Sequence, residues 1–137
     1  MMEAKQGKEV VVRIRNSIGL LFELTKLLSE KGVGILAVNG MVLGEDCVVR
    51  VVTNDNLRAK DALVAANYAP HEENVIVIDL PHKPGMLRRV AEILAQEDID
   101  IHHLYATALE EQDKSLLVFH TSNDHHALTK LKDLKTV

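Results

Sequence analysis

The order of hydrophobic and polar positions along the chain repeats once, 66 residues later. Residues 10–15 form a mostly β-branched run, and residues 20–31 carry apolar side chains at intervals of three and four. The first pattern is typical of a buried strand and the second of an amphipathic helix. Residues 76–80 and 86–96 show the same two patterns in the same order. This repetition predicts one small unit that is built twice.

The first copy continues with two further strands and a second helix. Residues 35–43 and 47–53 have strand composition and flank a Gly-Glu-Asp hairpin signal. The pair Asn54-Asp55 is a good N-cap for a helix that follows. A strand after Tyr68 would complete the order β-α-β-β-α-β.

The second copy predicts the same order, with a longer hairpin over residues 99–122. Its offset from the first copy grows to 69 after the hairpin, because residues 110–114 lengthen the loop. A last helix follows Asn123-Asp124, and its inward-facing residues are Leu128, Leu131 and Leu134. Few residues follow this helix, so we expect the second unit to lack a clear last strand.

These patterns predict an α+β protein made of two units, over residues 9–74 and 75–137, with antiparallel sheets side by side. Residues 68–80 are nearly uninterrupted after Pro70, so we expect this stretch to close the first sheet and open the second. No Gly/Ser-rich or Pro-rich linker separates the two copies.

Composition narrows the classes of function. Hydrophobic residues make up 47% of the chain and aromatic residues 3%, which predicts an aliphatic core. The net charge is -4 at pH 7, whereas nucleic-acid binding needs a clustered basic surface, so we expect no nucleic-acid partner. No apolar run approaches the ~20 residues of a membrane span, and the N-terminus lacks the apolar core of a signal peptide. We expect a cytoplasmic protein with no membrane partner, in which Cys47 is a buried or half-buried thiol.

The turn between the first strand and the first helix carries the candidate chemistry in both copies. In the second copy it is His82-Lys83-Pro84-Gly85-Met86-Leu87, and Asp98-Ile99-Asp100-Ile101 follows the helix. In the first copy it is Asn16-Ser17-Ile18-Gly19-Leu20-Leu21, and Gly32-Val33-Gly34-Ile35 follows the helix. A glycine lets the backbone approach a ligand closely, and the next helix N-terminus offers N–H groups to a carboxylate.

These two turns resemble the motif of the ACT-domain family. In that family Asp or Asn, any residue, Pro and Gly precede the helix, and a Gly-Val/Ile-Asn-Ile type run follows it. The resemblance covers residues 9–135, so the chain is similar to a tandem ACT-domain protein. It implies two ferredoxin-like units that form a non-catalytic regulatory module and bind an amino acid or similar small metabolite at an interface. It also implies a homodimer and association with a metabolic enzyme.

The resemblance assigns ligand-binding roles to residues of both copies. In the second copy these residues are His82, Pro84, Gly85, Met86, Leu87 and Asp100. In the first copy they are Asn16, Gly19, Leu20 and Leu21, with Gly34 at the position that Asp100 holds in the second.

The departures from the motif favour unequal sites. His82 replaces the usual Asp or Asn, so binding would vary between about pH 6 and 7. Asp100 replaces Asn and is a strong acceptor for an ammonium group. Ile18 replaces Pro in the first copy. We therefore expect the second copy, or an interface that pairs Asn16 with Asp100, to bind better.

Seven histidines leave a His-based metal-binding module open as an alternative. If the hairpin turns at Glu111-Gln112, His103 lies opposite His120, and Asp100 shares a strand face with His102. Imidazole and carboxylate groups suit transition metals. Adjacent histidines, however, point to opposite faces of a flat strand, and no established metal motif is present. We predict no metal and no cofactor.

Catalytic motifs are absent from the sequence. It contains no G-x-S-x-G, no P-loop, no full dinucleotide fingerprint and no credible Cys–His pair. We predict no enzymatic activity and no catalytic residue. A further alternative is a ligand-free interaction subunit of a metabolic enzyme that docks through a sheet edge or a helix face.

Overall fold

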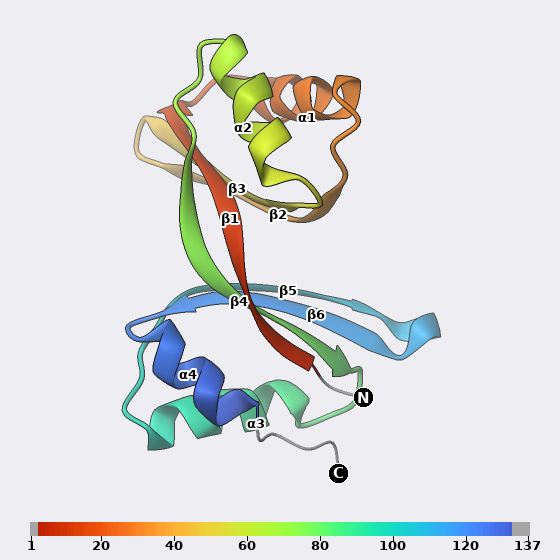
Figure 1. Ribbon diagram of the computed structural model, residues 1–137, viewed down its shortest axis with the longest axis vertical. Helices are drawn as coiled ribbons and strands as arrows, with labels where there is room; N and C mark the ends of the chain where they lie inside the picture. Colours follow the sequence, from red (N-terminus) through yellow and green to blue (C-terminus); the bar gives the residue numbers. More distant parts are fainter. Residues whose placement is uncertain (1–2, 133–137) are drawn as a thin grey trace. The chain divides into compact units, whose positions relative to one another are not determined.

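The structure is a computed structural model that describes residues 3–132 and confirms the α+β class with two β-α-β-β-α units (Figure 1). The chain divides into two compact parts. The first unit comprises Lys8–Glu73. The second unit comprises the residues before Lys8 together with those from Asn74 onward.

The first unit is a three-stranded antiparallel sheet covered by two helices. It contains most of β1 (Glu3–Arg15), then α1 (Leu20–Glu30), β2 (Ile35–Leu43), β3 (Asp46–Thr53) and α2 (Asn56–Ala65). The strand order is β2-β3-β1, and both neighbouring pairs are antiparallel. The core is aliphatic, as the composition predicts, and includes Val10, Val12, Val49, Val51, Leu20, Leu24 and Leu28. Cys47 is half-buried at the start of β3.

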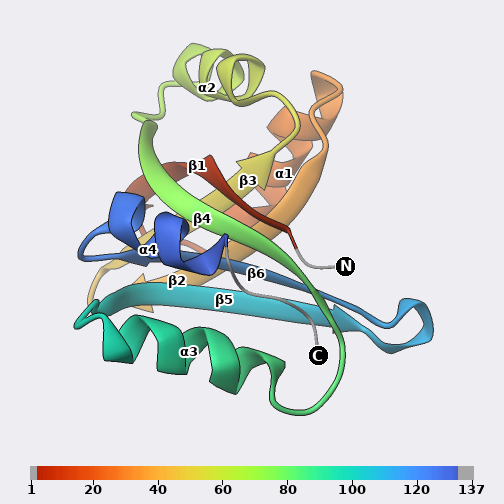
Figure 2. The same ribbon diagram turned by 60° about the horizontal axis from the view of Figure 1, so that its bottom comes forward.

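The second unit repeats this order. Its elements are β4 (His71–Pro81), α3 (Met86–Gln96), β5 (Ile101–Leu109), β6 (Lys114–Thr121) and α4 (Asp124–Leu131). The strand order is β4-β6-β5, again antiparallel. The lengthened hairpin loop holds a short 3-10 helix, η1 (Glu110–Gln112), at one end of the β5–β6 hairpin (Figure 2).

Both second helices begin at the capping residues that the sequence predicts. The Asp55 side chain accepts a hydrogen bond from the Arg58 N–H at 3.1 Å, and Asn123 accepts one from the His126 N–H at 3.1 Å. Leu131 of α4 is buried and Leu128 is partly buried against the same core. Leu134, also expected to face inward, lies outside the described residues.

The N-terminal part of β1 belongs to the second unit, whereas the sequence patterns placed the first copy from residue 9 onward. Ala4 packs against the core of the second unit. Gly7 lies so close to β4 that an added Cβ would be 3.2 Å from a methyl group of Val77 and 3.7 Å from one of Val75. These residues thus add an extended segment to the second unit. Within residues 3–132, no strand follows α4.

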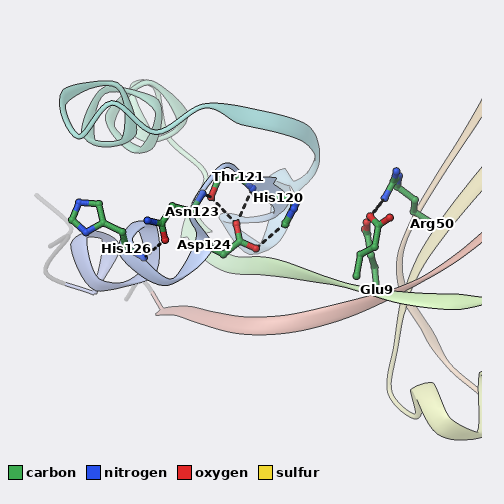
Figure 3. A network of polar contacts seen from close by, with 8 residues as sticks. Glu9, Arg50, His120, Thr121, Asn123, Asp124 and His126 are labelled. Atoms are coloured by element: carbon green, nitrogen blue, oxygen red, sulfur yellow. Dashed lines mark hydrogen bonds and ion pairs between the residues drawn. The ribbon is translucent and has the colours of Figure 1, made fainter.

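One carboxylate of the first unit is completely buried. The side chain of Glu9 has no exposed area, and its Oε1 lies 2.6 Å from Nη1 of Arg50 (Figure 3). The same Arg50 nitrogen lies 2.6 Å from Glu73. Burial alone would lower the pKa of the Arg50 guanidinium, but its hydrogen bonds to Glu73 and Glu9 outweigh this effect and raise the pKa.

Candidate ligand-binding site

The turn from β4 into α3 is fixed by a left-handed glycine. Gly85 is the N-cap of α3, with φ 91° and ψ -7°, and no side chain caps the helix. The Gly85 carbonyl accepts the first helical hydrogen bond from the Arg89 N–H at 3.0 Å. An added Cβ would meet no atom within 4 Å, so the backbone conformation rather than the available space requires glycine here.

The first unit has the same turn at the corresponding position. Gly19 is the N-cap of α1, with φ 86° and ψ 4°, and no side chain caps this helix either. The Glu23 N–H donates to the Gly19 carbonyl at 3.0 Å. The two turns therefore share one backbone geometry, although Ile18 stands where the second copy has Pro84.

A pocket of about 320 Å³ lies beside the β4–α3 turn of the second unit. Its lining comes from the end of β4, the turn, the first turn of α3, and the facing ends of β5 and β6. The lining residues are Leu80, Pro81, His82, Lys83, Gly85, Met86, Leu87, Arg88, Ala106, Thr107, Ala108, Ser115 and Leu117. The lining is thus mostly apolar, with three basic side chains, two hydroxyl groups and no carboxylate.

The structure brings most of the turn residues singled out in the second copy to this pocket. His82, Gly85, Met86 and Leu87 all line it, and Pro84 belongs to the same turn. Met86 is buried in the core, whereas the Leu87 side chain is half exposed.

Asp100 lies near the opposite end of the same sheet. It directly precedes β5, whereas the pocket lies beside Thr107 near the far end of that strand. A strand rises about 3.3 Å per residue, which separates the two positions by roughly 23 Å. The Asp100 side chain is 81% exposed, and its carboxylate lies 3.8 Å from His102. A single unit therefore does not bring Asp100 to a ligand held at the turn.

The residues singled out in the first copy surround the β1–α1 turn. The Asn16 N–H donates to the Glu45 carbonyl at 2.8 Å. Leu20 is buried in the core, while Leu21 is half exposed. The Gly34 N–H donates to Oδ1 of Asn54 at 2.9 Å, so Gly34 serves the loop that precedes β2.

Sequence reasoning did not identify Lys83, Arg88, Thr107 or Ser115 as pocket residues. Ser115 reaches the pocket because the register places it opposite both Leu80 and Ala108, and Thr107 lines the pocket from the position next to Ala108 on β5. Hairpin register depends on the loop, and the loop of the second copy differs in length from that of the first. Lys83 occupies the variable position of the predicted motif and Arg88 directly follows the motif, so their position alone was the available signal.

Three histidines gather near the Asp100 end of the second unit. His103 pairs with His120 across the hairpin, as expected. A register shift between Ile101 and His103 bends β5, and the rings of both His102 and His103 lie near that of His120, with centroids 5.7 Å and 5.8 Å away. The flat-strand argument against the joint action of His102 and His103 therefore does not apply at this bulge.

The Asp124 carboxylate contacts the imidazole ring of His120. This carboxylate lies 2.8 Å from Nδ1 of His120 and also accepts hydrogen bonds from the backbone and the hydroxyl group of Thr121, both at 2.7 Å (Figure 3). The aspartate thus orients the imidazole from the first turn of α4.

Solved structures with the same architecture include three proteins. Protein BT0572 from Bacteroides thetaiotaomicron is similar with a TM-score of 0.87 and 25% identity, over 95% of this chain and 89% of that one. The regulatory subunits of aspartate kinase from Thermus thermophilus and Thermus flavus have TM-scores of 0.67 and 0.60, with 12% and 13% identity. Each comparison covers 96% of this chain and 94% of the other. No curated protein matches the sequence.

Two further findings concern membrane-spanning helices and family membership. Among residues 3–132, no helix combines the length and the apolar character needed to cross a membrane. The family model of an ACT domain pair matches residues 6–135. Such pairs are regulatory modules, typically non-catalytic and typical of amino-acid binding. The chain belongs to the ACT-domain family, with both ferredoxin-like domains of the pair in one polypeptide.

Proposed function

We propose that this protein is a non-catalytic regulatory module that binds an amino acid or a similar small metabolite at the β4–α3 turn. The observation that carries the proposal is the pocket of about 320 Å³ at that turn, lined by His82, Gly85, Met86 and Leu87. Small-molecule sites commonly enclose about 300–1,000 Å³, so the pocket suits a compact metabolite. The uncapped N-terminus of α3 adds N–H groups and a partial positive charge, both suited to a carboxylate.

Asp100 enters this proposal as a contact from another unit. Within its own unit it lies roughly 23 Å along the strand from the pocket. Asp100 can accept the ligand's ammonium group in two arrangements. In one, the start of β5 in a neighbouring unit lies against the β4–α3 turn. In the other, the ligand lies between Asp100 and the turn that carries Asn16. The site is then complete at an interface rather than inside one unit.

A homodimer and a partner enzyme are part of the proposal. The first unit exposes several large apolar side chains near its turn and along its edge strand, namely Ile18, Phe22, Leu36, Met41 and Val42. Large apolar side chains left exposed in numbers on one unit make its surface a candidate for a protein interface. Two proteins of the same fold are regulatory subunits of aspartate kinase, which makes a metabolic enzyme the class of partner to test. Light scattering after size-exclusion chromatography, with Phe22→Glu as the variant, tests the dimer.

Thermal melting against the twenty amino acids tests the ligand. A compound held only by the folded state raises the melting midpoint with concentration, equivalent to about 2.7 kcal/mol at a hundred times its Kd. Thr107→Phe, which fills the pocket, is expected to abolish the shift. Asp100→Ala is expected to abolish it as well, whereas Glu110→Ala on the hairpin loop leaves it intact.

The two variants test separately the position of the site and the role of Asp100. If Asp100→Ala shifts as the parent does while Thr107→Phe does not, the pocket is the site and the role of Asp100 is wrong. Flat melts for all twenty amino acids would contradict ligand binding and favour the ligand-free interaction subunit.

A histidine-based metal site is the second candidate function. It is favoured by the proximity of the His102 and His103 rings to that of His120 and by Asp124, which engages Nδ1 of His120 and leaves Nε2 as a ligand atom. Among residues 3–132 the ligand atoms of these three histidines do not form a group within 4.8 Å, so the proposal is a platform of two histidines rather than three. Zinc or nickel would then raise the melting midpoint, and a chelator would reverse the effect. His120→Ala should remove the shift, whereas His125→Ala on α4 should retain it.

A further inference from the structure

The floor of the pocket is aliphatic. Leu80, Met86 and Leu117 line it and are each at most 6% exposed, so their side chains form a fixed surface of the core. Leu87 adds a half-exposed apolar side chain. The small residues Ala106 and Ala108 also line the pocket. Such a surface gains about 25 cal/mol for each Å² of apolar ligand area that it removes from water.

The charged groups of the lining all have the same sign. Lys83 and Arg88 are basic, His82 contributes an imidazole, and no Asp or Glu belongs to the lining. Arg88 pairs with Glu92, whose oxygen lies 4.0 Å from Nε, and the Arg88 side chain is 85% exposed. An exposed pair of this length is weak, so the guanidinium can still engage an anion that enters the pocket.

The aliphatic floor and the basic lining together restrict which chemical group of a ligand can lie on the floor of the pocket. A cationic side chain, as in lysine, would meet like charges and no carboxylate. An anionic side chain, as in aspartate, would lose water over an aliphatic surface that offers it no hydrogen bond. An alkyl or aryl group would neither be repelled by the basic residues nor lose hydrogen bonds to water on the floor. The basic rim and the α3 N-terminus meanwhile accommodate one carboxylate.

We propose that the pocket takes a carboxylate that carries an apolar tail, either an apolar amino acid or the corresponding 2-oxo acid. The carboxylate lies at the α3 N-terminus and Arg88, and the tail lies on Leu80, Met86 and Leu117. This inference rests on the proposed function and names the class of ligand for the same site.

Isothermal titration calorimetry on the full chain tests the ligand class. The apolar probes are L-leucine, L-phenylalanine and 4-methyl-2-oxopentanoate, and the polar probes are L-aspartate and L-lysine. We expect at least one apolar probe to bind at least tenfold more tightly than either polar probe. Leucinamide, which lacks the carboxylate, should show no binding. A comparison of leucine with 4-methyl-2-oxopentanoate identifies which of the two sources supplies the ligand.

Two variants test the placement of the carboxylate. Arg88→Gln should weaken binding by up to about fivefold, the upper end of the range for an exposed ion pair, while Arg89→Gln on the next residue should leave it unchanged. Ala108→Asp brings a negative charge to the lining and should weaken binding of the apolar carboxylate at least tenfold.

The outcomes distinguish this inference from the function beneath it. If aspartate or lysine binds more tightly than every apolar probe and Thr107→Phe abolishes that binding, the proposed function stands and the apolar ligand class is wrong. Binding of leucinamide equal to that of leucine would also overturn the inference. Absence of binding by every amino acid and oxo acid would overturn the proposed function itself.

Discussion

Arg50 donates a 2.6 Å hydrogen bond to Glu9, a carboxylate with no exposed area. The two residues come from β3 and β1, so the pair joins neighbouring strands of the first unit. Because a buried charge is costly without its counter-ion, the Arg50 guanidinium is a condition for burial of Glu9.

Replacement of Arg50 by Met should therefore destabilise the protein strongly. We expect a loss of about 3–5 kcal/mol in the free energy of unfolding, because the buried carboxylate loses the charge that balances it. Urea denaturation measures this loss. Arg13→Met is the matched control, since its pair with Asp46 is exposed on both sides and should cost less than about 1 kcal/mol. Equal losses in the two variants would contradict a special role for the buried pair.

The pH dependence of stability should follow Glu72 and Glu73. A hydrogen bond from Lys60 lowers the pKa of Glu72 below 4.5. Burial alone would raise the pKa of Glu73, but hydrogen bonds from His71 and Arg50 outweigh it and lower that pKa below 4.5. Both carboxyls thus take up protons at lower pH in the folded state than in the unfolded chain. Their stabilisation is complete above the unfolded pKa and is lost as the pH falls through the folded pKa.

Lys60→Met should make the free energy of unfolding depend less steeply on pH. Between about pH 5 and pH 3 the variant should lose less stability on acidification than the parent, because the pKa of Glu72 returns toward its ordinary value. Chemical denaturation at several pH values within this range measures the two slopes. Lys26→Met is the control, because the Lys26–Glu30 pair is long and exposed, and its slope should match that of the parent. If the stability of Lys60→Met falls with pH as steeply as that of the parent, the pair of Lys60 with Glu72 does not cause the dependence.

Gly85→Val should destabilise the second unit even though the site has room for a side chain. The cost is one of conformation, about 1–3 kcal/mol for a β-branched residue held at φ 91°. Gly40→Val on β2 is the matched control, because its Cβ would also meet nothing within 4 Å and its φ is not positive. Thermal melting compares them, and a Gly85→Val midpoint equal to that of Gly40→Val would contradict the backbone explanation.

Gly7→Val should loosen the second unit through its N-terminal segment. An added Cβ already lies 3.2 Å from Val77, so a larger side chain must displace the segment or the strand, at about 1–3 kcal/mol. Hydrogen exchange should show reduced protection in β4 and β6. Gln6→Val, at an exposed position of the same strand, should keep the parent's protection. Unchanged protection in Gly7→Val would mean that the segment does not contribute to this unit.

Local signals were enough to predict most of the fold. The glycines at the two turns, the capping residues Asp55 and Asn123, and the helix spacings act within a few residues, and the structure places each as expected. The N-terminal part of β1 escaped prediction because its residues are mainly polar and its place beside β4 depends on residues far along the chain. The approach of His102 to His120 escaped it too, because the bulge between Ile101 and His103 is a property of strand pairing.

By itself, the sequence determined that one β-α-β-β-α unit occurs twice, that a glycine begins each first helix, and that the second copy departs from the first at Pro84 and Asp100. Periodicity and conformational preference are local, so they can be read along the chain. Only the tertiary structure decided that the first residues complete the second unit, that Thr107 and Ser115 face the β4–α3 turn, and that Asp100 lies far from that turn in its own unit. Strand register and the burial of a side chain depend on residues far apart in sequence, and packing alone brings them together.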